Sequence, residues 1–239
     1  MKKTILLCLF SWFTSCMDAQ FHTSIDIVSS IDYAEFKGAN IIPQDLNFSI
    51  FPIHITSKVN YRIGGNFNFR CYDKLLIKTG VRYVQIGFKQ NLEGYILYGN
   101  NGNSTSPNDP YVIELICNSF DQKFIEVPLM ARYEFGDGKF SLFIEFGISP
   151  HIRLSSTNIR RTKNGDEAID DFVLNGDGRI LTALVIGVGG NYNLSQNYQL
   201  FMQPTFRVYS ASTNEFEIEN RVRSMGLEFG IRRGISFSE

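Results

Sequence analysis

The sequence predicts an all-β protein, an eight-stranded antiparallel up-and-down transmembrane β-barrel, and three observations support this class. Apolar and polar residues alternate with a period of two in eight runs between residues 21 and 237, as in strands that separate an apolar from a polar environment. The connections between these runs are alternately short turns and long polar loops, as in barrels that cross an outer membrane. An export signal precedes the first run.

The N-terminus has the pattern of a secretory signal. Lys2 and Lys3 precede a short apolar run at residues 5–13, and Ala19-Gln20 is the expected cleavage region. We therefore predict a signal peptide at residues 1–20 and a barrel domain at residues 21–239. Lipoprotein processing that leaves Cys16 acylated is the alternative.

The first four runs each keep their apolar side chains on one face. In the third run the alternation slips at Val84-Gln85-Ile86, which predicts a β-bulge. Pro128 lies in the fourth run, and a bulge or strand end must absorb its missing N–H. The four runs span residues 21–33, 53–69, 75–86 and 125–135.

The last four runs continue the pattern. Pro150 and Pro204 raise the same problem as Pro128, and the glycine-rich sixth run leaves its two faces unassigned. In the final run Arg233 falls on the apolar face. Since it is near the end of the strand, we expect it at the membrane boundary, where an Arg costs only ~0–1 kcal/mol. The four runs span residues 140–154, 180–194, 198–208 and 224–237.

The connections predict which ends of the strands lie together. Short turns are expected at residues 72–74, 136–138 and 195–197, and long loops near residues 34–52, 89–123, 155–179 and 209–222. A meander gathers all the short turns at one end, which is the periplasmic end in outer-membrane barrels. Cys71 and Cys117 then lie at opposite ends, too far apart for the ~5–6 Å Cα separation of a disulfide.

The polar face is expected to point into the barrel. It is rich in glycine, as a crowded interior requires, and it carries both signs of charge. Because eight strands enclose a lumen just wide enough for side chains, we expect ion pairs to fill it. A soluble lipocalin-like carrier of a hydrophobic ligand, with its apolar face inward, is the alternative. The charges expected inside are Lys58, Arg62, Lys78, Arg82, Arg132, Arg153, Arg207 and Arg232 against Asp26, Glu126, Glu134, Glu145 and Glu228.

The sequence of residues 124–133, FIEVPLMARY, resembles a strand motif of the PorT-like outer-membrane β-barrel proteins of Bacteroidota. Residues 75–87 and 143–154 are similar to the strands that flank this motif in the family. The resemblance covers essentially the whole mature chain and implies an eight-stranded fold in the outer membrane. The relatives that give the family its name support protein secretion across the outer membrane, which the resemblance extends to this chain as an expectation.

We expect a non-enzymatic scaffold or binding protein without catalytic, cofactor-binding or metal-binding residues. The net charge of -1 offers nothing to attract nucleic acid. Outer-membrane lipid and lipopolysaccharide, the latter through basic residues 160–163, and an envelope or secretion-system protein are the expected partners of a monomeric barrel. The alternative is a lipid-modifying enzyme, in which His151 activates Ser149 as nucleophile with Glu145 as the acid.

Overall fold

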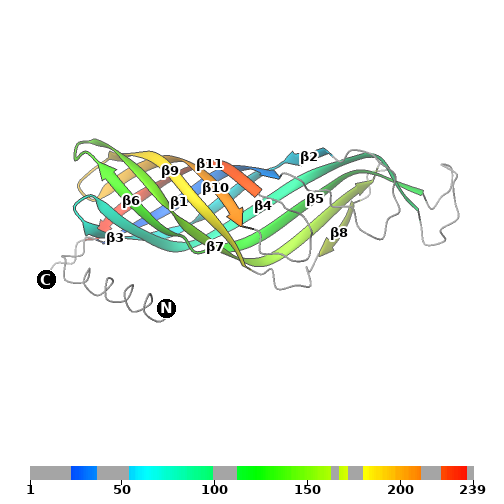
Figure 1. The fold of residues 1–239 in the computed structure, drawn as a ribbon, viewed down its shortest axis with the longest axis horizontal. Helices are drawn as coiled ribbons and strands as arrows, with labels where there is room; N and C mark the ends of the chain where they lie inside the picture. The colour runs from blue at the N-terminus through cyan, green and yellow to red at the C-terminus, as the bar shows by residue number, and fades with distance from the viewer. Residues whose placement is uncertain are drawn as a thin grey trace.

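One antiparallel sheet closes on itself to form a barrel (Figure 1). The computed structural model describes residues 23–36, 54–98, 112–162, 167–171, 180–210 and 222–235, so the predicted signal peptide and Cys16 lie outside them. Among the described residues, no helix is long and apolar enough to span a membrane. The strand segments are β1 (Thr23–Phe36), β2 (His54–Ser57), β3 (Val59–Tyr72), β4 (Leu75–Tyr98), β5 (Val112–Glu126), β6 (Leu129–Phe135), β7 (Phe140–Thr162), β8 (Glu167–Asp171), β9 (Ile180–Asn193), β10 (Tyr198–Ser210) and β11 (Val222–Ile235).

The ring has eight positions, as predicted. Each position of the ring pairs antiparallel with the next position along the chain, and β1 pairs with β11 over its whole length, from Thr23↔Ile235 to Phe36↔Val222, which closes the barrel. β2 and β3 share one position and are separated at Lys58, and β5 and β6 share another. Of the strands in the described residues, only β8 lies outside the ring, paired with the far part of β7. A closed ring bonds its backbone internally and leaves no edge facing lipid.

The two faces of the sheet lie as the alternation predicts. Outward-facing Ile27 is 70% exposed, whereas Asp26 beside it is fully buried. The sixth run, left unassigned above, points Leu184 and Ile186 outward and Val185 inward. The apolar face is therefore outside and a largely polar face lines the interior, which is the opposite of a lipocalin-like carrier.

The β-bulge predicted at residues 84–86 is wrong. β4 keeps an unbroken register with β3 from Leu76↔Arg70 to Gln85↔Tyr61, and with β5 from Arg82 to Asn91. Val84 and Ile86 point inward and are buried, whereas Gln85 between them lies on the other face and is only partly buried. The apolar alternation of the sequence shifts phase at this point because two apolar side chains occupy luminal positions.

The prolines are accommodated where the ladders are interrupted. Pro128 lies in the break between β5 and β6, and Pro150 lies opposite this break on β7, where its carbonyl accepts a hydrogen bond of 2.9 Å from the N–H of Val127. Pro204 lies in β10 at a gap in the register with β9, between Met202↔Gly190 and Thr205↔Gly187. The prediction that a bulge or strand end absorbs each missing donor is confirmed for Pro128 and Pro150, which lie at the break between β5 and β6. It is wrong for Pro204, because the register with β9 is the same on both sides of the gap and β10 continues through it.

Short turns gather at one end of the barrel, which we call the short-turn end. The turn between β6 and β7 uses Gly136 with φ of +84°, a conformation that favours glycine. Cys71 lies at this end, in β3. Cys117 pairs with Asn91 on β4, and Arg70 pairs with Leu76 on the same strand. About 15 residues of strand at ~3.3 Å each separate the two levels, so the thiols are about 50 Å apart.

Strand replaces much of what was predicted as long loop at the other end. β4 continues to Tyr98, β5 begins at Val112, and β7 runs on to Thr162 and folds back into β8. Residues 89–98, 112–123, 155–162 and 167–171 therefore form a sheet extension beyond the ring (Figure 1), and the predicted loop boundaries there are wrong. The alternation is weaker in these segments, because water meets both faces of a sheet that stands outside the membrane. The remainder of the predicted loops lies outside the described residues.

Candidate functional site: the filled lumen

Charged side chains of both signs fill the lumen. Among the described residues, six acidic and six basic side chains are buried in the lumen, so the interior is close to neutral. Inward-facing residues on seven of the eight ring positions supply them, and β9 supplies none. They are Asp26, Asp32, Glu126, Glu134, Glu145 and Glu228, with Arg62, Lys78, Arg82, Arg132, Arg207 and Arg232.

The cluster nearest the sheet extension centres on Arg62, a buried residue of β3. Its Nε donates to Asp32 Oδ2 at 2.6 Å, its Nη1 to Glu126 Oε2 at 3.2 Å and its Nη2 to Tyr209 Oη at 2.5 Å. Arg207 on β10 approaches the other oxygen of Asp32, at 2.7 Å. These contacts join four positions of the ring across the lumen, and one buried carboxylate bridges two guanidinium groups.

A second cluster fills the middle of the barrel. Lys78 Nζ lies 2.6 Å from Glu145 Oε1, and Arg132 lies 2.8 Å from the other oxygen of Glu145. Arg82 places two nitrogens on the two oxygens of Glu228, at 2.8 and 3.2 Å. Fork-to-fork contacts of this kind fix the positions of both partners.

A third cluster closes the short-turn end. Arg232 donates to Asp26 at 2.9 Å and to Glu134 at 2.9 Å, and Asn68 donates to Asp26 at 2.8 Å. Arg70, at the rim, lies 3.1 Å from Glu134. The charges predicted for the lumen lie there with two exceptions. Arg153 is only half-buried, and Lys58 pairs with Asp121 on the face of β4 that carries Gln85 and Gly87, so its predicted luminal place is wrong.

Apolar side chains separate these clusters, and the sequence analysis did not place them inside. Val28, Phe143 and Phe201 form one buried group, and the guanidinium of Arg132 lies 3.8 Å from the centre of the Phe143 ring. A larger group lies mainly toward the extension: Ala34, Val84, Ile86, Phe124, Met130, Ala183, Val185 and Tyr209. In the sequence, Phe143 and Phe201 each occupy a polar position of an otherwise regular run, and this is the sign that an aromatic ring lies inside.

Two large luminal side chains of one apolar group have glycine as their partner. Phe143 pairs with Gly189, and Phe201 with Gly230, directly across their ladders. A Cβ on Gly189 would lie 2.9 Å from Cε1 of Phe143, and one on Gly230 would lie 2.6 Å from Cζ of Phe201. The luminal glycines thus make room for rings and for charged groups, as the crowded interior predicted by the sequence requires.

The structure does not assemble the triad considered for a lipid-modifying enzyme. Ser149 Oγ donates to Glu126 Oε1 at 2.5 Å, and His151 Nδ1 lies 2.8 Å from the backbone oxygen of Ser149. Glu145 pairs with Lys78 and Arg132 instead. Ser149 and His151 are both fully buried in the lumen, so neither side chain faces a lipid on the outside.

The base of the sheet extension is also built from specific contacts. Lys58 Nζ donates to both oxygens of Asp121, at 2.6 and 2.7 Å, and Gln85 donates to the same carboxylate at 3.1 Å. The rings of Phe88 and Phe120 stack with centroids 4.8 Å apart. The described part of the chain shows no cluster of three or more His, Cys, Asp or Glu residues that could hold a metal ion.

Several solved structures resemble this fold. Neisserial surface protein A is 12% identical, with 89% of this chain and 97% of that one covered and a TM-score of 0.43. The outer membrane protein OprG of Pseudomonas aeruginosa is 11% identical, with 91% and 98% covered and a TM-score of 0.47. Ail, the attachment invasion locus protein of Yersinia pestis, is 10% identical, with 90% and 99% covered and a TM-score of 0.36. No curated protein sequence matches the chain.

A family model identifies the chain more directly. The model described as outer membrane protein beta-barrel domain matches residues 35–217, which is most of the sequence. This match agrees with the closed ring of eight positions, the apolar exterior and the polar interior. The protein is an outer-membrane β-barrel, and the chain belongs to the outer membrane protein beta-barrel domain family.

Proposed function

We propose that the protein is a non-enzymatic outer-membrane scaffold that binds a partner through its sheet extension. The observation that carries this proposal is the filled lumen. Three ion-pair clusters joined by apolar side chains cross the interior, so the surfaces left for a protein partner outside the membrane are those at the two ends.

The sheet extension is the better of the two ends. Beyond Ile152, the last residue of β7 that pairs with β9, β7 continues for ten residues, and β4 and β5 extend alongside it. At ~3.3 Å a residue this is about 30 Å of strand outside the ring. Its outer strand β8 pairs only with β7 among the described residues, so it presents an edge to which a partner strand can add.

From the resemblance to PorT-like proteins, we also propose that the protein assists the secretion of other proteins across the outer membrane. The motif at residues 124–133 itself builds the wall: Glu126 and Arg132 belong to the luminal clusters, and Pro128 lies at the break between β5 and β6. The motif thus contributes to the barrel, and the contact with a secretion partner falls to the extension.

Contact with lipopolysaccharide is the second part of the proposal. Arg161 lies in the last pair of β7 with β8, where it is exposed, and basic residues precede and follow it in the sequence. Such a position at the outer surface would allow it to meet lipid phosphates. The closed ring supports a monomeric barrel, because it offers a second copy no strand edge within the membrane.

Site-specific photo-crosslinking in cells tests the proposed binding surface. A photoreactive amino acid at exposed Thr56 or Lys89, at the extension, is expected to capture the same protein, whereas one at lipid-facing Ile27 is not. Exposed Asp137 reports on the short-turn end. Capture only from position 137 would contradict the proposal and assign the partner to the periplasmic end. Retention of secreted proteins in cells that lack the chain would support the secretion role, and normal secretion would exclude it.

A further inference from the structure

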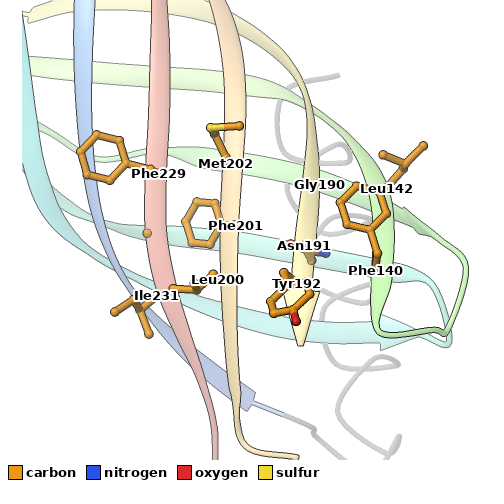
Figure 2. Close-up of a pocket in the computed structure, with 11 residues that line it drawn as sticks. Phe140, Leu142, Gly190, Asn191, Tyr192, Leu200, Phe201, Met202, Phe229 and Ile231 are labelled. Carbon is orange, nitrogen blue, oxygen red and sulfur yellow. The ribbon is translucent and has the colours of Figure 1, made fainter. Parts of the chain in front are cut away.

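A groove of about 590 Å³ lies on the outer wall of the barrel, over β7, β9, β10 and β11 (Figure 2). Two rows of paired residues line it. One row runs Leu142, Gly190, Met202, Phe229, and the row nearer the short-turn end runs Phe140, Tyr192, Leu200, Ile231. Its volume falls within the ~300–1,000 Å³ of small-ligand sites.

The groove exists because one outward position lacks a side chain. Leu184, Ile186, Val188 and Tyr192 alternate outward along β9, and Gly190 takes the next place in that series. A Cβ on Gly190 would lie 2.9 Å from the ring of Phe140, which leans over it from β7. The floor is therefore backbone and the walls are apolar side chains, so the shape suits a flexible hydrocarbon chain.

Two cations flank the end of the groove that is closer to the short-turn end. Lys139 Nζ lies 5.3 Å from the ring centre of Tyr192, which itself lines the groove, and the Arg233 guanidinium lies 5.8 Å from the ring centre of Tyr198. Tyr198 pairs directly with Arg233 and is two residues from Leu200. Neither cation has an ion-pair partner among the described residues.

Along the groove, apolar walls are followed by two tyrosines and then by two cations. This order matches a lipid from its hydrocarbon tail, through the interfacial region, to its headgroup. Tyrosine belts and basic side chains mark the membrane–water boundary, and the short-turn end of such barrels faces the periplasm. We propose that the groove binds an acyl chain of a phospholipid of the periplasmic leaflet, and that Lys139 and Arg233 bind its phosphate and favour a headgroup of net negative charge over one that also carries an ammonium group.

Native mass spectrometry of the full mature barrel in non-ionic detergent tests the site with phosphatidylglycerol and phosphatidylethanolamine as probes. The wild type is expected to retain one phosphatidylglycerol in preference to phosphatidylethanolamine. Lys139→Gln and Arg233→Gln should each weaken binding of phosphatidylglycerol about fivefold. Lys74→Gln, in another turn of the same end, is the matched control and should leave binding unchanged.

The hydrocarbon part of the site is tested separately. Gly190→Leu fills the groove and should abolish retention of the lipid. Gly65→Leu is the control, because Gly65 also takes an outward place, on β3, and its nearest neighbour for a Cβ is 3.5 Å away. The folded gel band is checked first, and Leu200→Trp, which narrows the groove from β10, replaces Gly190→Leu if that variant does not fold.

Three outcomes would overturn the proposal. Retention by Gly190→Leu or Leu200→Trp equal to that of the wild type would show that the groove is not the binding site. Equal binding of both phospholipids by the wild type and by the two cation variants would remove the role of Lys139 and Arg233. Displacement of phosphatidylglycerol by millimolar inorganic phosphate would indicate a free-anion site instead of a lipid site.

Discussion

The ring of Phe143 occupies the space that a side chain on Gly189 would need, and the two residues are direct partners across the β7–β9 ladder. Phe201 and Gly230 have the same relationship across β10 and β11. The interior is therefore packed by matching large side chains with glycines, in the way that a core is packed with large and small residues. Stability and closure of the lumen should both depend on these pairs.

Alanine at Gly189 or Gly230 should overpack the lumen. The added methyl group meets an aromatic ring at less than 3 Å, and such overpacking typically costs ~1–3 kcal/mol of folding free energy. Urea unfolding of the detergent-refolded barrel, followed by the heat-modifiable gel band, measures the loss. Gly234→Ala is the control, since the nearest atom to its Cβ is 4.0 Å away. Equal stability of all three variants and the wild type would contradict the packed lumen.

Arg62 should matter far more than Lys58, although both belong to the same crossing of the membrane. Arg62→Met leaves Asp32 and Glu126 buried without their main partner, and breaking a buried ion pair in this way costs ~3–5 kcal/mol. Lys58 is 27% exposed and its pair with Asp121 lies outside the lumen, beside Gln85, so Lys58→Met should cost about 1 kcal/mol or less. Thermal gel-shift curves of the two variants measure the difference in stability. Equal losses of stability would contradict the prediction that the buried Arg62 pairs matter more than the partly exposed Lys58 pair.

Ser149 and His151 should be structural residues. Ser149→Ala removes the donor that lies 2.5 Å from Glu126 Oε1, and leaving a buried charged acceptor without it should cost at least ~1–3 kcal/mol. Lipid A from cells that express the wild type, Ser149→Ala or His151→Ala should give the same mass spectrum. A lipid modification seen with the wild type and lost in both variants would instead assign catalysis to this pair.

The two ends of the barrel should face opposite sides of the outer membrane. With Cys71 and Cys117 replaced by serine, a cysteine at Lys89 should react with a membrane-impermeant maleimide on intact cells. A cysteine at Asp137 should react only after the outer membrane is made permeable. Both positions are exposed and they lie at opposite ends of the fold. The reverse labelling pattern would invert the orientation derived from the short turns.

The fold class, the strand count and the two faces could be predicted from the sequence because a period of two is a local property of strands. Short connections likewise placed Gly136 and the other turns at one end. The sequence also suggested which charges lie inside, but it could not pair them. Arg62 meets Tyr209 across 147 residues and Arg232 meets Asp26 across 206 residues, and such contacts follow from ring closure and register.

Two kinds of feature escaped the sequence pattern for physical reasons. Val84 and Ile86 are apolar but face the lumen. The apolar residues of this strand therefore change from outward to inward positions, which predicted a β-bulge that is absent from the strand. The ends of β4, β5 and β7 looked like loops, because strands that leave the membrane no longer need an apolar face. The outer groove at Gly190 could not be predicted either, because the sequence does not show which side chains surround this glycine.

The most direct test of the filled lumen is the ionic conductance of the purified wild-type barrel in planar lipid bilayers. Because the ion-pair clusters and apolar groups cross the interior, the inserted protein should give no steady single-channel current, whereas its folded state is verified by the gel shift in the same preparation. A stable, ohmic current from the wild type that changes its ion selectivity when Arg82 is replaced by Glu would show an open luminal path and contradict the account.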